Sequence, residues 1–261
     1  MDSNHNQRAG KRPRFNLKII RRKRLIVFVL VLTLGLIGYA SYWGYQQNQK
    51  QQDLMLSDYP IHGVTINQDN ETIDFQQLQN QKISYVYLNA TSGATYFDDS
   101  FNGNFNRAQG SNLAMGAIHT FSFSSSARRQ FEFFQKKVGS NNGNLPICID
   151  VNYYGKYKSN NVHWNKQGAN IKKLMSLFAN YYASPVIVRT SFKIYRILDV
   201  HYITESHFWI TDKIGKAKQK NIDFIDFDDN RSFKIDGSEI QLDESFYNGN
   251  WQSWNKNLNH N

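Results

Sequence analysis

The chain has only one cysteine, Cys148, among its 261 residues. A single cysteine excludes an intramolecular disulfide and a zinc site made of four cysteines. It lies in the apolar run Leu145–Val151, where a lone cysteine is typically a small buried core residue. A glycine-rich phosphate loop and the G-x-S-x-G motif are also missing, and no histidine or acidic cluster has the spacing of metal ligands. We therefore expect neither a metal ion nor a cofactor.

Acidic residues are nearly absent from the first 24 positions, which contain nine basic residues and one acid, Asp2. The net charge of +10 therefore comes mainly from this tail, because the rest of the chain has 22 basic and 20 acidic residues. A near-neutral remainder argues against a basic face that binds nucleic acid. We expect no nucleic-acid partner.

Charge is absent from Leu25–Trp43, a run of 19 residues that is apolar apart from Thr33 and Ser41. As a helix it would span about 28 Å, which is close to the hydrocarbon thickness of a bilayer. Tyrosines and a tryptophan gather at its end, as they do at membrane interfaces. A cleaved signal peptide is the alternative, but the run is long and Tyr39-Ala40-Ser41 is a poor cleavage site. The pattern favours an uncleaved transmembrane helix over residues 25–45.

The basic cluster Arg21–Arg24 lies directly before this apolar run. By the positive-inside rule, the N-terminus is then cytoplasmic and the C-terminal part lies outside the cytoplasm. The predicted organisation is a basic cytoplasmic tail (1–24), the transmembrane helix (25–45), a polar, glutamine-rich stalk (46–58) and one outer domain (59–261). The predicted location is the cell membrane, crossed once.

From residue 59 onward, apolar runs alternate with segments of helical periodicity. Strands are predicted at 62–66, 83–88, 113–120, 146–151, 186–189, 208–211 and 222–227. Helices are predicted at 73–79, 101–109, 124–138 and 165–182. Strands that alternate with helices indicate a single α/β domain with a parallel sheet.

Short motifs of this outer part follow one another in a familiar order. They are GVTIN at Gly63–Asn67, IDFQQL at Ile73–Leu78, ISYVY at Ile83–Tyr87, ATSG at Ala90–Gly93, YFD at Tyr96–Asp98 with Phe101, MGAIHTF at Met115–Phe121, PICIDVN at Pro146–Asn152, FWI at Phe208–Ile210 and DESFYNG at Asp243–Gly249. In this order and spacing, the outer domain resembles glycoside hydrolase family 25, which includes bacterial and phage lysozymes (muramidases). The resemblance implies an irregular, TIM-like (β/α) barrel, preceded here by the one N-terminal transmembrane helix. Function is then expected at the C-terminal ends of the strands.

Hydrolysis of a glycosidic bond needs a carboxylic acid that protonates the leaving oxygen and a second group that stabilises the oxocarbenium-like centre. The resemblance implies that a D-x-E motif at the end of the fourth strand supplies these groups, on one face because they are two residues apart. Here the motif is Asp150-Val151-Asn152. Asn152 stands where the general acid is expected, and an amide has no proton of suitable pKa to donate.

Three other positions bear on the catalytic set that the resemblance implies. Asp243 matches the carboxylate of the last strand, whereas Thr65 stands at the aspartate of the first strand and Ser92 at the glutamate of the A-T-E-G turn. Asp150 and Asp243 are thus the retained catalytic carboxylates, and Asn152 and Thr65 are substituted catalytic positions. The retained Asp150 fits either a binding role or a buried carboxylate paired with a backbone donor.

Candidates for substrate binding are Ser92, His119 and Tyr153. His119 lies in an apolar strand, where a hydrogen-bonded core histidine is the common alternative to a cleft residue. Tyr153 opens a group of tyrosines after the fourth strand, which could stack on sugar rings or pack at the rim.

Acids elsewhere are weaker substitutes for the missing carboxyl groups. Asp69, Glu71 and Asp98 lie in loops near the expected mouth of the barrel, but loop acids are usually solvated. Asp226 and two further aspartates, at 228 and 229, form an acidic patch in the sequence. Its spacing is not that of a calcium-binding loop.

Two functions are compatible with these residues. The first is a membrane-anchored family 25 lysozyme-like domain directed at the glycan strands of peptidoglycan, with weak or lost catalysis. The second is a non-catalytic module, a pseudoenzyme that binds wall glycan or a protein partner. Residue 152 discriminates between turnover and binding, since fold alone does not fix function.

Overall fold

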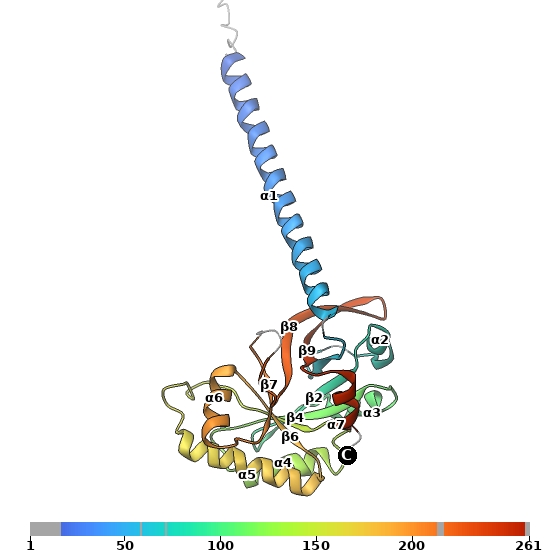
Figure 1. Cartoon of the computed structure of the whole chain (residues 1–261). Helices are drawn as coiled ribbons and strands as arrows, with labels where there is room; N and C mark the ends of the chain where they lie inside the picture. The colour runs from blue at the N-terminus through green and yellow to red at the C-terminus, as the bar shows by residue number, and fades with distance from the viewer. Residues whose placement is uncertain (1–16, 58, 71, 213–216, 259–261) are drawn as a thin grey trace, which may run out of the picture. The chain divides into compact units, whose positions relative to one another are not determined.

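The computed structural model describes residues 17–57, 59–70, 72–212 and 217–258. The chain divides into two compact units, residues 1–57 and 58–261. In the first unit, helix α1 (Leu17–Ser57) includes Arg21–Gln47, a stretch long and apolar enough to cross a membrane (Figure 1). The helix continues through the glutamine-rich stretch after residue 46, so the predicted stalk is helical as far as Ser57.

The second unit is built on a sheet that closes into a barrel. Its strands are β1 (His62–Ile66), β2 (Tyr85–Ser92), β3 (Tyr96–Phe97), β4 (Ala114–Thr120), β5 (Ile147–Asp150), β6 (Val186–Thr190), β7 (His207–Ile210), β8 (Ile222–Ile235) and β9 (Ser238–Tyr247). Among the described residues, the strand order is β1-β9-β8-β7-β6-β5-β4-β2-β3, and β1 also pairs with β2. This last pairing closes a barrel of eight strands, with β3 as an extra edge strand beside β2.

Helices lie around the outside of the barrel (Figure 1). They are α2 (Phe75–Asn80), α3 (Phe101–Gln109), α4 (Ala127–Val138), α5 (Trp164–Tyr182) and α6 (Phe192–His201). A further helix, α7 (Trp251–Leu258), covers one end of the barrel. The side chains of Asp74, Ser126 and Ser191 cap the N-termini of α2, α4 and α6 by accepting hydrogen bonds from backbone N–H groups of the first turn. The predicted TIM-like (β/α) barrel is therefore confirmed, and most predicted elements begin and end within a few residues of the observed ones, except β8, which extends to Ile235 and not to 227.

The C-terminal part of the barrel departs from the sequence prediction. Strand β9 is antiparallel to both β1 and β8, so the sheet is mixed and not wholly parallel as predicted. The β8–β9 hairpin turns at Asp236 and Gly237, which both have positive φ angles, 51° and 80°. Asp-Gly is a typical sequence for such a two-residue turn. The prediction missed this hairpin, the short edge strand β3, and the helices α6 and α7.

Alternation along each strand divides the buried side chains into two layers. Side chains that point into the barrel include Tyr85, Tyr87, Trp209 and Phe224, whose rings pack on one another with centroids 5.0–6.2 Å apart. Side chains that point outward pack against the helices. Phe134 of α4 and Phe178 of α5, for example, meet in the outer layer at 4.8 Å between ring centroids.

The N-terminal end of the barrel is closed by Trp254 of α7. This indole is 4 % exposed and packs on Tyr85 and Tyr247, at 5.4 and 5.2 Å between centroids. Tyr85 is the first residue of β2, so the contact lies at the start of the parallel strands. The opposite end, where the parallel strands finish, is left for a functional site.

Candidate functional site

Asp150 and Asn152 lie together at the end of β5. Asp150 is the last residue of the strand, and its side chain is 17 % exposed. The Asn152 amide donates a hydrogen bond from Nδ2 to Asp150 Oδ1 at 2.6 Å. The two side chains are thus on one face of the chain, as their spacing predicts. Thr190 of β6 fixes the residue between them, because its Oγ1 donates to the carbonyl oxygen of Val151 at 2.6 Å.

A second partner of Asp150 comes from the neighbouring strand. Arg189 of β6 donates from Nη1 to Asp150 Oδ2 at 3.4 Å and from Nη2 to Asp226 Oδ2 at 2.7 Å. The other carboxylate oxygen of Asp226 accepts a hydrogen bond from Trp209 Nε1 at 2.6 Å. The guanidinium also lies over the Trp209 ring, 5.1 Å from its centroid. One buried cation therefore joins two carboxylates across β5, β6 and β8.

This network sets the protonation of the site. Burial raises the pKa of Asp150, and the positive charge of Arg189 and the hydrogen bond from Asn152 oppose this increase. Burial disfavours the charged form of Arg189, yet the adjacent carboxylates of Asp226 and Asp150 hold its pKa above the usual value. Both oxygens of Asp150 accept hydrogen bonds. With both oxygens engaged as acceptors, Asp150 is suited to hold the neighbouring donors Asn152 and Arg189 in place, whereas a general acid would need a free proton to donate.

The other two predicted catalytic positions adjoin one another on β1 and β9. Thr65 is buried, and its Cα partner across the sheet is Asp243, whose side chain is exposed. Asp243 lies near the end at which β1 finishes, so it faces the same mouth of the barrel as Asp150. On the next strand, Asp226 pairs in register with Ser245. The three carboxylates thus come from strands β5, β8 and β9 and lie toward the same end of the barrel.

A cavity of about 440 Å³ opens beside Asn152. The ends of β2, β4 and β5 supply its walls, which are lined by Ser92, Gly93, Ala94, Thr95, Tyr96, Thr120, Phe121, Ser122, Ser124, Ser125, Asn152, Tyr153 and Tyr154. The rings of Tyr96 and Tyr154 are 47 % and 41 % exposed. Hydroxyl groups beside exposed aromatic rings are the combination that sugars bind. The structure therefore brings together Ser92, Asn152 and Tyr153 from the predicted site.

The position of His119 gives no support to its prediction as a substrate contact. Its ring is fully buried and points outward into the helical layer, against Phe134 and Phe178. Nδ1 lies 2.7 Å from Thr91 Oγ1 and Nε2 lies 3.1 Å from Gln130 Oε1, so both ring nitrogens have partners within the protein. Burial lowers the pKa of His119 to about 4. His119 is the hydrogen-bonded core histidine that the apolar strand allowed.

Two acidic residues differ from the solvated groups that the sequence indicated. Asp98 is 1 % exposed and accepts hydrogen bonds from the backbone N–H groups of Gln68 and Ser100, at 2.9 and 3.0 Å. Burial raises the pKa of Asp98. Asp226 is 6 % exposed and belongs to the Arg189 network, not to a surface patch. Glu71, the third loop acid, lies outside the described residues.

Sequence reasoning also missed Arg189 and Trp209 as parts of the site. A signal was present for the arginine, because Arg189 interrupts the apolar strand Val186–Thr190 at an inward position, two residues after Ile187. A charge at an inward strand position needs a buried partner. For Asp226 the corresponding signal is its place two residues after the inward Phe224.

Comparison with known proteins agrees with this geometry. The family model for glycosyl hydrolases family 25 matches residues 64–235. That match covers more than half of the chain, and the chain belongs to this family.

Individual relatives are distant. YegX of Escherichia coli K12 is 26% identical over 139 residues, which are 51% of this chain and 51% of YegX, so the chain spans about half the length of this curated relative. A family 25 glycosyl hydrolase from Bacillus anthracis has a TM-score of 0.68 at 23% identity, over 76% of this chain and 94% of the other. A lysozyme from Streptomyces coelicolor has a TM-score of 0.65 at 17% identity, over 76% and 97%. At these identities the two structures show a shared fold.

The buried His119 predicts a specific pH dependence of stability. Its pKa is about 4 in the folded chain and about 6.5 when unfolded. Between pH 4 and pH 6.5, His119 is therefore protonated in the unfolded state but not in the folded state. Its contribution to the free energy of unfolding is fully present above pH 6.5 and is lost as the pH falls toward 4. The loss is up to about 3 kcal/mol. In urea titrations, His119→Gln should show a shallower loss from pH 7 to pH 4 than the unmutated chain. Equal slopes would contradict a neutral His119.

Removal of the bridging cation should destabilise the barrel. Arg189→Met leaves Asp150 and Asp226 without their shared partner, and loss of one member of a buried pair costs roughly 3–5 kcal/mol at pH 7. The cost should fall at pH 5, because burial raises the pKa of Asp150 and its protonation relieves the repulsion with Asp226. Asp226→Asn added to Arg189→Met should recover part of the loss. Urea unfolding followed by near-UV circular dichroism measures these differences.

Arg128→Met is the matched control, since Arg128 forms an exposed pair with Glu132 at 3.9 Å, and such surface pairs contribute at most about 0.5 kcal/mol. Equal losses in Arg189→Met and Arg128→Met would mean that the network does not stabilise the fold.

Proposed function

We propose that this chain is a membrane-anchored, extracytoplasmic family 25 domain that binds the glycan strands of peptidoglycan, with weak or lost hydrolysis. Structural relatives named lysozymes or muramidases support peptidoglycan as the ligand, since enzymes of these names act on that polymer. The cavity at the C-terminal ends of the strands is where we propose that the glycan binds, because sites of barrels of this kind lie at that end.

The main support for weak or lost hydrolysis is the hydrogen bond that Asn152 donates to Asp150. An amide occupies the position where the general acid is expected, and it donates its N–H to the carboxylate that remains. Arg189 holds the other oxygen of Asp150, and Asp226 accepts hydrogen bonds from Arg189 and Trp209. Both carboxylates are thus engaged as acceptors. Loss of a general acid reduces the rate by about 10²–10⁴.

The cavity beside Asn152 supports retained binding. It combines the exposed rings of Tyr96 and Tyr154 with the hydroxyl groups of Ser92 and Ser122. The Tyr154 ring is held in place, because its hydroxyl accepts a hydrogen bond from the backbone N–H of Phe123 at 2.9 Å and its ring stacks on that of Phe123. A fixed aromatic ring beside hydroxyl groups offers a sugar both stacking and hydrogen bonds without ordering a flexible segment.

The anchored, outward topology is supported by the charge pattern around the apolar helix. Arg21–Gln47 has the length and hydropathy of a membrane span, and it begins with four consecutive basic residues. Positive charge of this kind marks the cytoplasmic side. The barrel would then face the wall.

Full-length protein in detergent, mixed with purified peptidoglycan, tests the binding proposal. We expect the chain to sediment with the polymer and to release no measurable soluble muropeptides. Asn152→Glu, which supplies a carboxyl group at the acid position, should gain detectable release, and Asp150→Asn added to it should abolish that gain. Asn106→Glu adds the same charge at an exposed position outside the cavity and serves as the control.

Release by the unmutated chain that is lost in Asp150→Asn would overturn the loss of hydrolysis and mean that another group acts as the acid. Failure to sediment with peptidoglycan would overturn the proposed ligand and favour a protein partner.

The lone cysteine allows a test of topology by thiol labelling. Cys148 is fully buried, so the folded, unmutated chain should not react with a membrane-impermeant maleimide. Ser159→Cys, at an exposed position of the barrel domain, should be labelled in intact cells. Ser3→Cys, in the basic tail, should be labelled only after lysis. The reverse pattern would contradict the proposed orientation, and loss of the barrel domain from the membrane fraction would contradict the anchor.

A further inference from the structure

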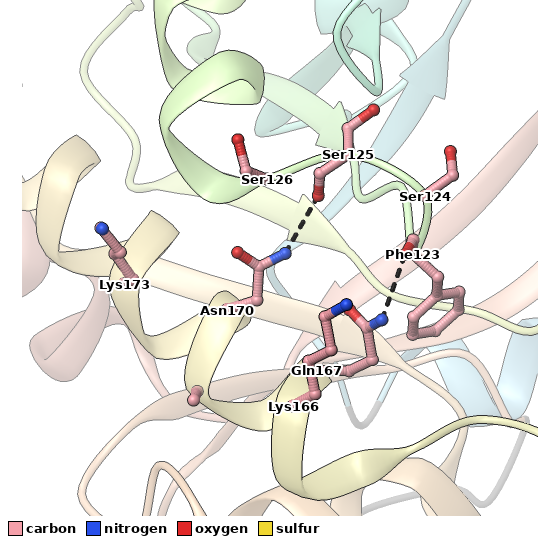
Figure 2. A pocket seen from close by; sticks show the side chains of 9 residues that line it. Phe123, Ser124, Ser125, Ser126, Lys166, Gln167, Asn170 and Lys173 are labelled. Carbon is pink, nitrogen blue, oxygen red and sulfur yellow. Dashed lines mark hydrogen bonds between the residues drawn. The ribbon is translucent and has the colours of Figure 1, made fainter.

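A second groove lies on the other side of the serine-rich turn that borders the cavity. It has a volume of about 370 Å³ and runs between Phe123–Ser126 and the first half of α5 (Figure 2). Ser124 and Ser125 line both this groove and the cavity beside Asn152. The two hollows are therefore neighbours, separated by one short turn of the chain.

Side chains of α5 hold this turn in place (Figure 2). Asn170 donates from Nδ2 to the carbonyl oxygen of Ser125 at 3.0 Å, and its Oδ1 accepts the backbone N–H of Ala127 at 2.8 Å. Gln167 donates from Nε2 to the carbonyl oxygen of Phe123 at 3.1 Å. The groove thus has a fixed wall, so little conformational entropy would be lost at this wall when a ligand binds.

Gln167 also leaves one hydrogen-bonding group unused. The residue lines the groove and is only 7 % exposed, and within the described part of the chain its Oε1 is buried without a hydrogen-bond partner. An unpaired buried acceptor costs about 1–3 kcal/mol, so a partner that donates an N–H or O–H would be favoured there. The wall of the groove therefore contains an unsatisfied buried acceptor, which a peptide amide N–H would satisfy once the Gln167 amide turns toward the groove.

The charge of the groove is positive. Lys166 and Lys173 are exposed on the same side of α5, seven residues apart, and line the groove together with Asn170 between them. The N-terminus of α4 begins directly after the serines, and its partial positive charge adds to that of the lysines. None of the nine described lining residues is acidic. The groove therefore favours a ligand with carboxylate groups.

We propose that this groove binds the peptide stem of peptidoglycan while the glycan occupies the neighbouring cavity. This inference rests on the proposed function. The stem branches from the glycan strand and presents both amide N–H groups and free carboxylates, which match the acceptor of Gln167 and the ammonium groups of Lys166 and Lys173. The shared wall of Ser124 and Ser125 places the two parts of one branched ligand side by side.

The test compares two forms of the polymer with full-length protein in detergent. One is intact peptidoglycan, and the other is the same material after an amidase has removed the peptide stems. We expect the unmutated chain to bind intact peptidoglycan about 5- to 10-fold more tightly than stripped glycan, the size expected for two exposed charge contacts. Lys166→Gln with Lys173→Gln should remove this difference and leave binding to stripped glycan unchanged.

The matched control is Lys172→Gln with Lys193→Gln. These lysines are also exposed on α5 and α6, and neither lines the groove, so the net charge changes equally while the groove stays intact. Equal affinity of the unmutated chain for intact and stripped polymer would overturn the groove as a peptide site and leave the proposed function standing. An equal decrease in both double variants would also overturn it, because the effect would then be net charge. Failure to bind either polymer would overturn the proposed function as well.

Discussion

Closure of the sheet is the constraint on which the site depends. The pairing of β1 with β2, and the insertion of antiparallel β9 between β1 and β8, bring the ends of all the barrel strands to one mouth. Trp254 fills the opposite end. Inward side chains near the mouth cannot reach the helical layer, so they must pair with one another or with a ligand. The candidate site is the result of this geometry, and its carboxylates come from strands far apart in the sequence.

Arg189 decides what those carboxylates can do. Its guanidinium contacts Asp150 and Asp226, which lie 39 and 37 residues away along the chain, and it stacks on Trp209. Two carboxylates close together repel and favour uptake of a proton, and the cation between them opposes the increase that burial and Asp226 cause in the pKa of Asp150. Together with the amide of Asn152, this arrangement suits hydrogen-bond acceptance and charge stabilisation better than proton donation.

The turn that contains Ser124 and Ser125 links the mouth of the barrel to its outer surface. One side of the turn borders the cavity with its exposed tyrosines, and the other borders the cationic groove on α5. Gln167 and Asn170 hold the turn through backbone hydrogen bonds, so its shape depends on how α5 packs. Packing in the outer layer, where Phe134 meets Phe178, thus supports both hollows.

Local patterns in the sequence were enough to predict the apolar N-terminal helix, most strands and helices of the barrel, and the placement of Asp150 and Asn152 on one face. These properties follow from hydropathy and from the two-residue period of a strand, which act over short distances along the chain. The reversal of β9, the burial of His119 and the partners of Arg189 were decided only in the tertiary structure. Each of these depends on which strands become neighbours when the barrel closes, and hydropathy within one segment carries no information about contacts across strands.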